Sequence, residues 1–287
     1  MTTKILLIFL ITSCSAYEKG RGNPVSGQSA STQAGPSTIE IQHTLVRDGV
    51  PDLTQTDITG SETGDGEQYC APASASNALV WLARHGYEKL ENDLNGNTLS
   101  QLEIAKILGN QDHMNTNLEE GTNPSQVLLG LKNFLHDRLI TPKQLTFQGW
   151  RNLVYHFESS AKVPNLEFIQ QMLSQKSIAL LNIGWYTYAE EHQTYERNSG
   201  HWVTLVGYER ATPENPGKLV IHDPSPRAGQ SPAAHHLTLK TISRGTLTGK
   251  NTGLPFSADG YYDVSEGINM RSGSDIAILD GLVVVQL

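Results

Sequence analysis

The spacing of apolar residues changes near residue 176, and this change limits the folds that the chain can adopt. Before it, apolar residues recur at intervals of three and four, as on the buried face of a helix. After it, short runs rich in β-branched residues are typical of strands. The expected helices cover 72–85, 98–109, 124–135 and 164–175, and the expected strands cover 177–186, 200–208, 218–222 and 275–286. Helices followed by strands indicate an α+β fold.

Cys70 is the only cysteine outside the extreme N-terminus, and it stands at the expected start of the first helix. Pro72 suits the first turn of a helix, where no backbone N–H is needed. A thiol at this position lies near unpaired N–H groups and the positive end of the helix dipole, which favours the thiolate. Cys70 is therefore a candidate nucleophile, although cysteine is also a common small core residue.

Two strands further along the chain carry groups that could activate this thiol. His201 stands at the entry of the strand 200–208, and Asp223 directly follows the strand 218–222. A nucleophilic thiol needs a base to take its proton, and the base needs an acceptor that fixes its tautomer. We therefore expect these residues to form a catalytic triad with Cys70. Taken singly, a strand-end histidine is often structural and an Asp-Pro pair is often a turn.

The motifs around these residues resemble those of papain-like cysteine peptidases, and in particular the double-glycine type that processes bacteriocin leaders. The resemblance covers about residues 45 to 230 and rests on four stretches, VPDLTQ at 50–55, CAPAS at 70–74, GHWVTLVGY at 200–208 and HDP at 222–224. It implies a papain-like two-lobe fold, in which a helical lobe carries Cys70 and an antiparallel sheet lobe carries His201 and Asp223. It also implies that Cys70 is the nucleophile, His201 the general base and acid, and Asp223 the residue that orients the imidazole.

The resemblance further implies an upstream glutamine that stabilises the oxyanion together with the Cys70 backbone N–H. In that family the glutamine lies about half a dozen residues before the cysteine, where this chain has Gly64. Gln55 is the first candidate, and residues 59–66 would then form an inserted loop, as their composition suggests. Gln68 is the alternative, although two residues leave little room for its side chain to fold back. Both glutamines could also be surface residues.

The N-terminus predicts export. An apolar run at 5–11 is too short to span a bilayer but suits the core of a signal peptide. The sequence ending at Cys14 resembles a bacterial lipobox, so we expect lipidation of Cys14 and a cell-envelope lipoprotein; ordinary cleavage after Ala16 and free secretion are the alternative. The expected segments are a signal peptide at 1–16, a disordered linker at 17–37 and the peptidase domain at 38–287.

Charge and composition exclude several other function classes. The formal net charge is −8 and the chain has no basic cluster, which argues against binding of nucleic acid or anionic lipid. A membrane partner is expected only through the N-terminal anchor. The adjacent His235 and His236 have no cysteine partners, and no histidine pair has the spacing of a zinc peptidase. We expect no metal and no other cofactor.

The leading hypothesis is an exported cysteine peptidase that hydrolyses peptide or protein substrates through a Cys-His-Asp triad and an acyl-enzyme. A transglutaminase-like enzyme or a cell-wall amidase is one alternative, because such thiol enzymes use the same kinds of residues. A non-catalytic surface binding protein on the same scaffold is the other alternative.

Overall fold

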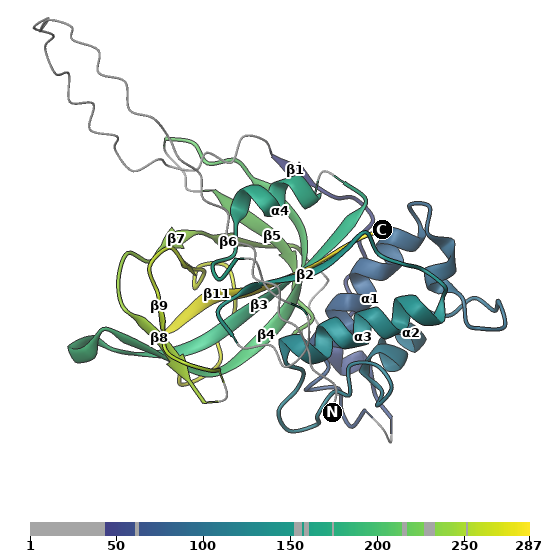
Figure 1. Cartoon of the computed structure of the whole chain (residues 1–287), viewed down its shortest axis with the longest axis horizontal. Coiled ribbons are helices and arrows are strands. Elements are labelled where there is room, and N and C mark those ends of the chain that lie inside the picture. Colours follow the sequence, from purple (N-terminus) through teal and green to yellow (C-terminus); the bar gives the residue numbers. More distant parts are fainter. Residues whose placement is uncertain are drawn as a thin grey trace, which may run out of the picture. The chain divides into compact units, whose positions relative to one another are not determined.

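A long curved sheet dominates the architecture of this protein (Figure 1). The computed structural model describes residues 44–60, 63–151, 157, 161–173, 175–213, 217–226, 233–250 and 252–287, all within one unit, Ile39–Leu287. The strands of this part are β1 Leu45–Val46, β2 Gln144–Gly149, β3 Ser177–Ala189, β4 Thr194–Glu209, β5 Lys218–His222, β6 His235–Thr238, β7 Lys240–Thr241, β8 Thr246–Gly249, β9 Phe256–Ser257, β10 Tyr262–Asp263 and β11 Ile276–Gln286. Its α-helices are α1 Cys70–Ala83, α2 Gln101–Gly109, α3 Pro124–Asp137 and α4 Leu166–Leu173, and its 3₁₀-helices are η1 Gln55–Asp57, η2 Glu88–Glu91 and η3 Glu190–His192.

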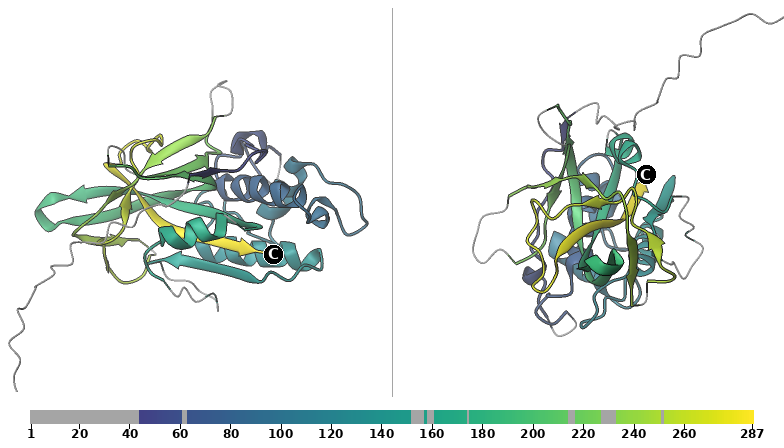
Figure 2. Two further views of the ribbon diagram at one scale, coloured as in Figure 1. Left: turned by 90° about the horizontal axis from the view of Figure 1, so that it is seen from above. Right: turned by 90° about the vertical axis from the view of Figure 1, so that its left-hand side faces the viewer.

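The centre of the sheet is built from its three longest strands. The strand order is β6-β5-β4-β3-β11-β10-β7, and β1 and β8 also pair with β4 while β2 pairs with β11. Strands β3 and β4 form a hairpin whose tip, at η3, extends away from α1 to α3 (Figure 2). The pairs are antiparallel except β4 with β8. His201 lies in the middle of β4 and is paired with Ile183 of β3, between the segment of β4 that pairs with β8 and the segment that pairs with β5.

Helices α1 and α3 pack directly on one face of this sheet. Ala71 and Leu79 of α1 and Phe134 of α3 share one buried cluster with Trp202 of β4 and Val283 of β11. All residues of α1 are buried, which fits a helix enclosed between the sheet and its neighbours. The helices and the sheet thus form one common core.

A second cluster lies on the opposite face of the sheet, where α4 packs. Ile169 and Leu173 of α4 contact a cluster that includes Leu181, Val203 and Ile221 of three neighbouring strands. Because these strands are apolar on both faces, they appear in the sequence as nearly continuous apolar runs. A further cluster fills the end of the sheet near β8 to β10.

The helix starts follow from local capping chemistry. The Ser100 side chain accepts from the backbone N–H of Glu103, whose side chain accepts in return from the Ser100 backbone N–H. Asn123 and Gln126 form the same reciprocal arrangement at the start of α3, and Pro124 occupies its first turn. These capping boxes satisfy backbone donors that otherwise lack intrahelical partners. The predicted helices at 98–109 and 124–135 are confirmed.

The expected papain-like two-lobe α+β fold is wrong. Among the described residues, eleven strands form a single sheet that curls until it is nearly closed, accompanied by four α-helices. There is no separate helical lobe opposite a sheet lobe in this part, because Cys70 and Trp202 belong to the same core cluster. The sequence predicted β3, β4, β5 and β11, and it did not predict β2. Strands β6 to β10 have two to four residues each, too few to show an alternating pattern.

Several expectations concern residues outside the described part of the chain. The signal peptide at 1–16, the lipidation site Cys14 and the linker at 17–37 all lie there. Across the described ranges, none of the helices has the length and apolar character needed to cross a bilayer.

Candidate active site

Helix α1 presents Cys70 at its first residue. Tyr69 is the N-cap residue, and Pro72 stands in the first turn, where its missing N–H removes no hydrogen bond. Cys70 is 9% exposed, so its surroundings are largely desolvated. The thiol lies beside backbone N–H groups of the first turn that have no intrahelical acceptor.

His201 and Asp223 are joined by a short hydrogen bond. Nε2 of His201 lies 2.6 Å from Oδ1 of Asp223, and both side chains are almost completely buried. Strand β4 supplies the histidine and the end of β5 supplies the aspartate, and these strands are neighbours in the sheet. A charge-assisted bond of this length fixes the orientation of the ring.

The Cys70 side chain lies close enough to His201 to raise the pKa of the imidazole. Burial by itself lowers the pKa of His201, but the charge and hydrogen bond of Asp223 outweigh it, and Cys70 adds to their effect, so the pKa is raised. The structure therefore brings Cys70, His201 and Asp223 close together, with His201 bonded directly to Asp223.

Ser225, two residues after Asp223, also belongs to the site, and the sequence analysis did not identify it. The Ser225 backbone N–H donates to Asp223 Oδ1 over 2.9 Å, and the Ser225 hydroxyl lies 3.1 Å from His201 Nε2. Burial by itself raises the pKa of Asp223, but His201 and these Ser225 bonds lower it far below its ordinary value. Asp-Pro-Ser is a common turn sequence in which the aspartate side chain accepts such a bond, so a signal was present.

The two candidate glutamines occupy different surroundings. Gln55 is buried, its side-chain amide donates to the backbone carbonyl of Glu67, and its backbone N–H donates to the carbonyl of Pro224 over 2.8 Å. It thus joins the segment before Cys70 to the residue after Asp223. The Gln68 side chain instead lies close to Gly121, in the loop before α3.

Gly66 allows the close contact between the Gln55 segment and the loop before Cys70. Its φ is +80°, and a Cβ atom on it would lie 2.1 Å from the backbone oxygen of Gln55. Any other residue would push these two segments apart. The end of the expected inserted loop, at Gly66, therefore lies against the candidate oxyanion residue.

A reciprocal pair of hydroxyl bonds joins α1 to β4, and sequence reasoning missed both residues. The Ser74 hydroxyl donates to the carbonyl of Trp202 over 2.9 Å, and the Thr204 hydroxyl donates to the carbonyl of Ser74 over 2.9 Å. Ser74 lies one helical turn after Cys70, and Trp202 directly follows His201. The Trp185 ring lies nearly parallel to the His201 imidazole, with ring centroids 6.2 Å apart.

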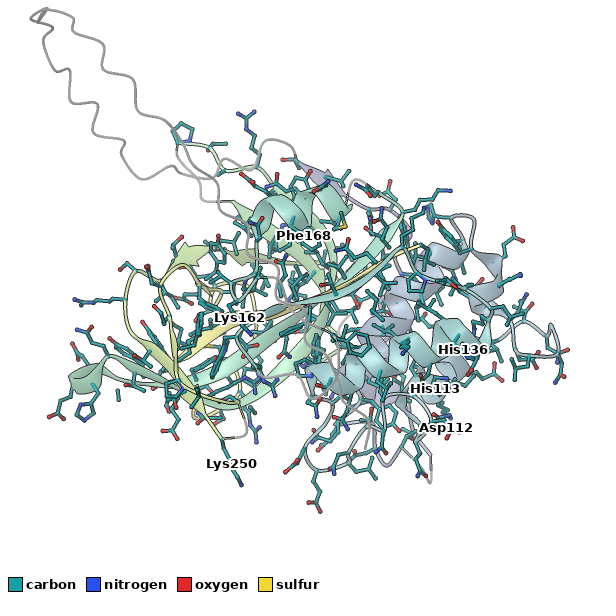
Figure 3. The ribbon with its side chains drawn as sticks, viewed as in Figure 1. Asp112, His113, His136, Lys162, Phe168 and Lys250 are labelled. Atoms are coloured by element: carbon teal, nitrogen blue, oxygen red, sulfur yellow. The ribbon has the colours of Figure 1, made fainter. Side chains whose placement is uncertain are left out.

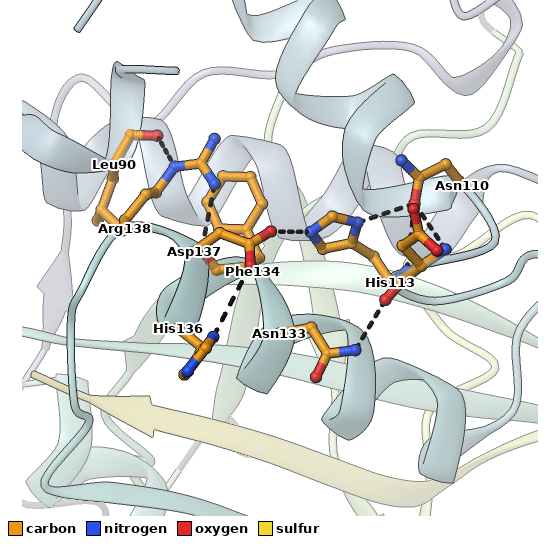
Figure 4. A network of polar contacts seen from close by, with 9 residues as sticks. Leu90, Asn110, His113, Asn133, Phe134, His136, Asp137 and Arg138 are labelled. Carbon is orange, nitrogen blue, oxygen red and sulfur yellow. Dashed lines mark hydrogen bonds and ion pairs between the residues drawn. The ribbon is translucent and has the colours of Figure 1, made fainter. Parts of the chain in front are cut away.

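A second buried histidine belongs to a separate network. His113 Nδ1 lies 2.8 Å from Asn110 Oδ1, and its Nε2 lies 3.1 Å from Asp137 Oδ2 (Figure 4). In Figure 3, His113 lies with Asp112 and His136 on the helical side, away from Lys250. Its partners join the loop after α2 to the end of α3, so His113 is a structural histidine.

A pocket of about 640 Å³ lies near the start of α1. Its lining includes Thr63, Tyr69, Lys106 and Asn110, and is mostly polar. Tyr69 immediately precedes the nucleophile candidate, but neither Cys70 nor His201 lines this pocket. The contact between the triad residues is therefore a feature separate from it.

Comparison with known proteins assigns no family to this chain. No protein-family model matches the sequence, and no curated protein matches it. The chemistry of the site thus follows from its own geometry.

Proposed function

We propose that this protein is a cysteine-type hydrolase that cuts peptide bonds. The observation that carries the proposal is the position of the His201 imidazole, with Nε2 2.6 Å from Asp223 Oδ1 and with Cys70 close enough to raise its pKa. A triad is recognised by geometry and roles rather than by fold. The same arrangement therefore supports the proposal on a sheet architecture that was not expected.

In the first step His201 takes the proton of the Cys70 thiol, and the sulfur attacks the carbonyl carbon of the scissile bond. A C–S bond forms, and the carbonyl π electrons move to the oxygen as an oxyanion. Asp223 stabilises the imidazolium that results. The raised pKa of His201 is consistent with an imidazole that holds this proton until the leaving group needs it.

The tetrahedral intermediate then collapses. The C–N bond breaks, His201 protonates the departing amine, and the acyl group stays on Cys70 as a thioester. Water next attacks the thioester carbonyl while His201 accepts its proton. The C–S bond breaks, the carboxylic acid leaves, and the thiol is restored.

Gln55 is the proposed side-chain donor to the oxyanion. An amide N–H is a suitable donor, and a preorganised donor stabilises the charge that develops in the transition state. Its amide nitrogen has two N–H groups, only one of which is needed for the Glu67 carbonyl. Gln55 is buried and its backbone is bonded to Pro224, next to Asp223, which supports Gln55 over Gln68.

The motif resemblance to double-glycine peptidases favours peptide bonds as the substrate class. Export, an N-terminal lipid anchor at Cys14 and the lack of a nucleic-acid partner belong to the same proposal. In this proposal the enzyme acts at the cell envelope on peptides or proteins.

Incubation of the full chain with a diverse peptide library under reducing conditions tests the function. Mass spectrometry should find new peptide termini with the wild type and none with Cys70→Ala or His201→Ala. His192→Ala, at the exposed tip of the β3–β4 hairpin, is the matched control and should cleave normally. New isopeptide bonds or released muropeptides, in place of cleaved peptides, would show a transferase or wall amidase instead.

A further inference from the structure

The amide side chain of Asn77 bonds to three other segments at once. Its Oδ1 accepts from the Leu53 backbone N–H over 2.9 Å and from the Gln101 side-chain amide over 2.6 Å. Its Nδ2 donates to the Thr204 hydroxyl over 3.4 Å. Asn77 is completely buried, and a buried amide of this kind stabilises a structure only when it is bonded.

The spacing along α1 and β4 links these bonds to the candidate triad. Cys70, Ser74 and Asn77 follow one another at helical intervals of four and three, so they share one face of α1. Seven helical residues span about 10.5 Å, and three strand residues span about 10 Å. Cys70 to Asn77 therefore matches His201 to Thr204 in length.

The Thr204 hydroxyl extends this contact. It accepts from Asn77 and donates to the carbonyl of Ser74, while the Ser74 hydroxyl donates to the carbonyl of Trp202. With Asn77 held at Thr204 and Ser74 at Trp202, the start of α1 lies against β4 at His201. These buried bonds therefore fix the register of the helix against the strand beside His201.

The same amide also holds the candidate oxyanion residue. Leu53 lies two residues before Gln55, and its backbone N–H has Asn77 Oδ1 as its acceptor. Since this backbone group can only donate, it also fixes which side of the Asn77 amide carries the oxygen.

We propose that Asn77 is a positioning residue that holds three segments in one register: the helix of Cys70, the strand of His201 and the segment of Gln55. The proposal rests on the proposed function of those three residues. Asn77 lies two helical turns from the sulfur and does not touch the reacting atoms. Its loss should therefore misalign Cys70, His201 and Gln55. We expect kcat to fall strongly, while KM changes little.

Four variants of the full chain, all carrying Cys14→Ser so that Cys70 is the only thiol, test this role. Asn77→Leu removes the amide, and Thr204→Val removes the hydroxyl at nearly constant volume. Thr204→Ser keeps the hydroxyl and is the conservative counterpart. Gln101→Met removes one bond to the same Asn77 oxygen. Gln101 lies outside the three segments that carry Cys70, His201 and Gln55.

Three quantities are measured well below each variant's unfolding temperature: kcat, KM, and the ratio of iodoacetamide alkylation rates at pH 6 and pH 9. An imidazolium beside the sulfur keeps it reactive at pH 6, where an ordinary thiol is almost fully protonated. A variant that only loosens the fold exposes the thiol at both pH values and does not lower this ratio.

Asn77→Leu and Thr204→Val should lower kcat about a hundredfold, the typical cost of a displacement of about 1 Å, with KM changed less than about threefold. Their alkylation ratio should fall about tenfold, whereas Thr204→Ser and Gln101→Met should keep the wild-type values within about threefold. If Asn77→Leu does not fold, the two Thr204 variants decide the question.

The proposal is overturned if Thr204→Val keeps the wild-type kcat and alkylation ratio, or if Gln101→Met loses as much as Asn77→Leu. If the wild type itself neither cleaves peptides nor reacts at pH 6, the proposed function fails and the positioning role fails with it. That outcome is separate from the first two, because in those the wild type is active.

Discussion

The side-chain amide of Gln55 donates to the backbone carbonyl of Glu67, three residues before the candidate nucleophile. This bond places Gln55, and not Gln68, as the better candidate for the oxyanion. We predict that Gln55→Ala lowers kcat about 10²- to 10³-fold, because it removes a donor that acts mainly on the transition state. Gln68→Ala should change kcat less than about threefold, as expected for a side chain outside the oxyanion site. Steady-state kinetics on one cleaved peptide gives both values, and the reverse order would assign the role to Gln68.

Because Asp223 orients His201, removing its carboxylate should lower activity even though Cys70 is still present. Asp223→Ala should lower kcat about a thousandfold, within the range for general acid–base groups, yet leave measurable cleavage. Cys70→Ala should leave none. Activity of Asp223→Ala close to that of the wild type would show that the imidazole is oriented by other groups.

The same pair makes stability depend on pH. The pKa of His201 is raised by Asp223, so its contribution is present below about pH 6.5 and is lost as the pH rises through the folded value. The pKa of Asp223 is lowered by His201, so its contribution is present above about pH 3.9 and is lost as the pH falls through the folded value. The difference in unfolding temperature between the wild type and Asp223→Asn should therefore be largest between about pH 4 and 6.5. A difference that stays constant up to pH 9 would contradict the assigned direction for His201.

A buried ion pair between β4 and β11 predicts a large stability effect. Arg197 Nε lies 2.5 Å from Asp280 Oδ2, which also accepts from the Tyr186 hydroxyl over 3.0 Å. Asp280→Ala leaves the Arg197 charge buried without its partner and should cost about 3–5 kcal/mol in urea unfolding. Lys240→Ala, at an exposed ion pair with Glu266, should leave the unfolding midpoint nearly unchanged. Equal effects of the two substitutions would contradict the burial argument.

At Gly130 of α3, a Gly→Ala substitution should destabilise the protein, although the same change usually stabilises a helix. In an exposed helix, Gly→Ala gains about 1 kcal/mol, but a Cβ on Gly130 would lie 2.3 Å from Met114 Cγ and 2.7 Å from the Met114 backbone nitrogen. Gly130→Ala should therefore destabilise the protein by about 1–3 kcal/mol in denaturant titration. Lys132→Ala, on the exposed side of the same helix, should have little effect. A stabilised Gly130→Ala variant would show that Met114 can move aside.

The helices were predictable because their signals are local. Ser100 with Glu103 and Asn123 with Gln126 are readable as capping boxes within four residues of sequence. The long strands were predictable from their apolar runs. The closure of the sheet was not, since the parallel pairing of β8 with β4 joins segments about fifty residues apart and leaves no periodic pattern.

The sequence analysis identified the candidate triad residues. It did not identify the residues that hold the helix and the strand of the site together. Cys70, His201 and Asp223 are identified by chemistry that few residue types can supply. Ser74 and Thr204 are common small hydroxyl residues, and their acceptors are backbone carbonyls that any sequence has. Their roles appear only when helix and strand are placed against each other.

Strand β11 is the last strand along the chain, yet it lies between β3 on one side and β2 and β10 on the other. Because β11 is synthesised after β2, β3 and β10, the edges of these strands that pair with β11 stay unpaired until residues 276–286 have left the ribosome. Such late, long-range pairing slows folding and leaves an edge open to association with other chains. A chaperone that keeps the polypeptide extended until β11 has emerged would protect it during this interval.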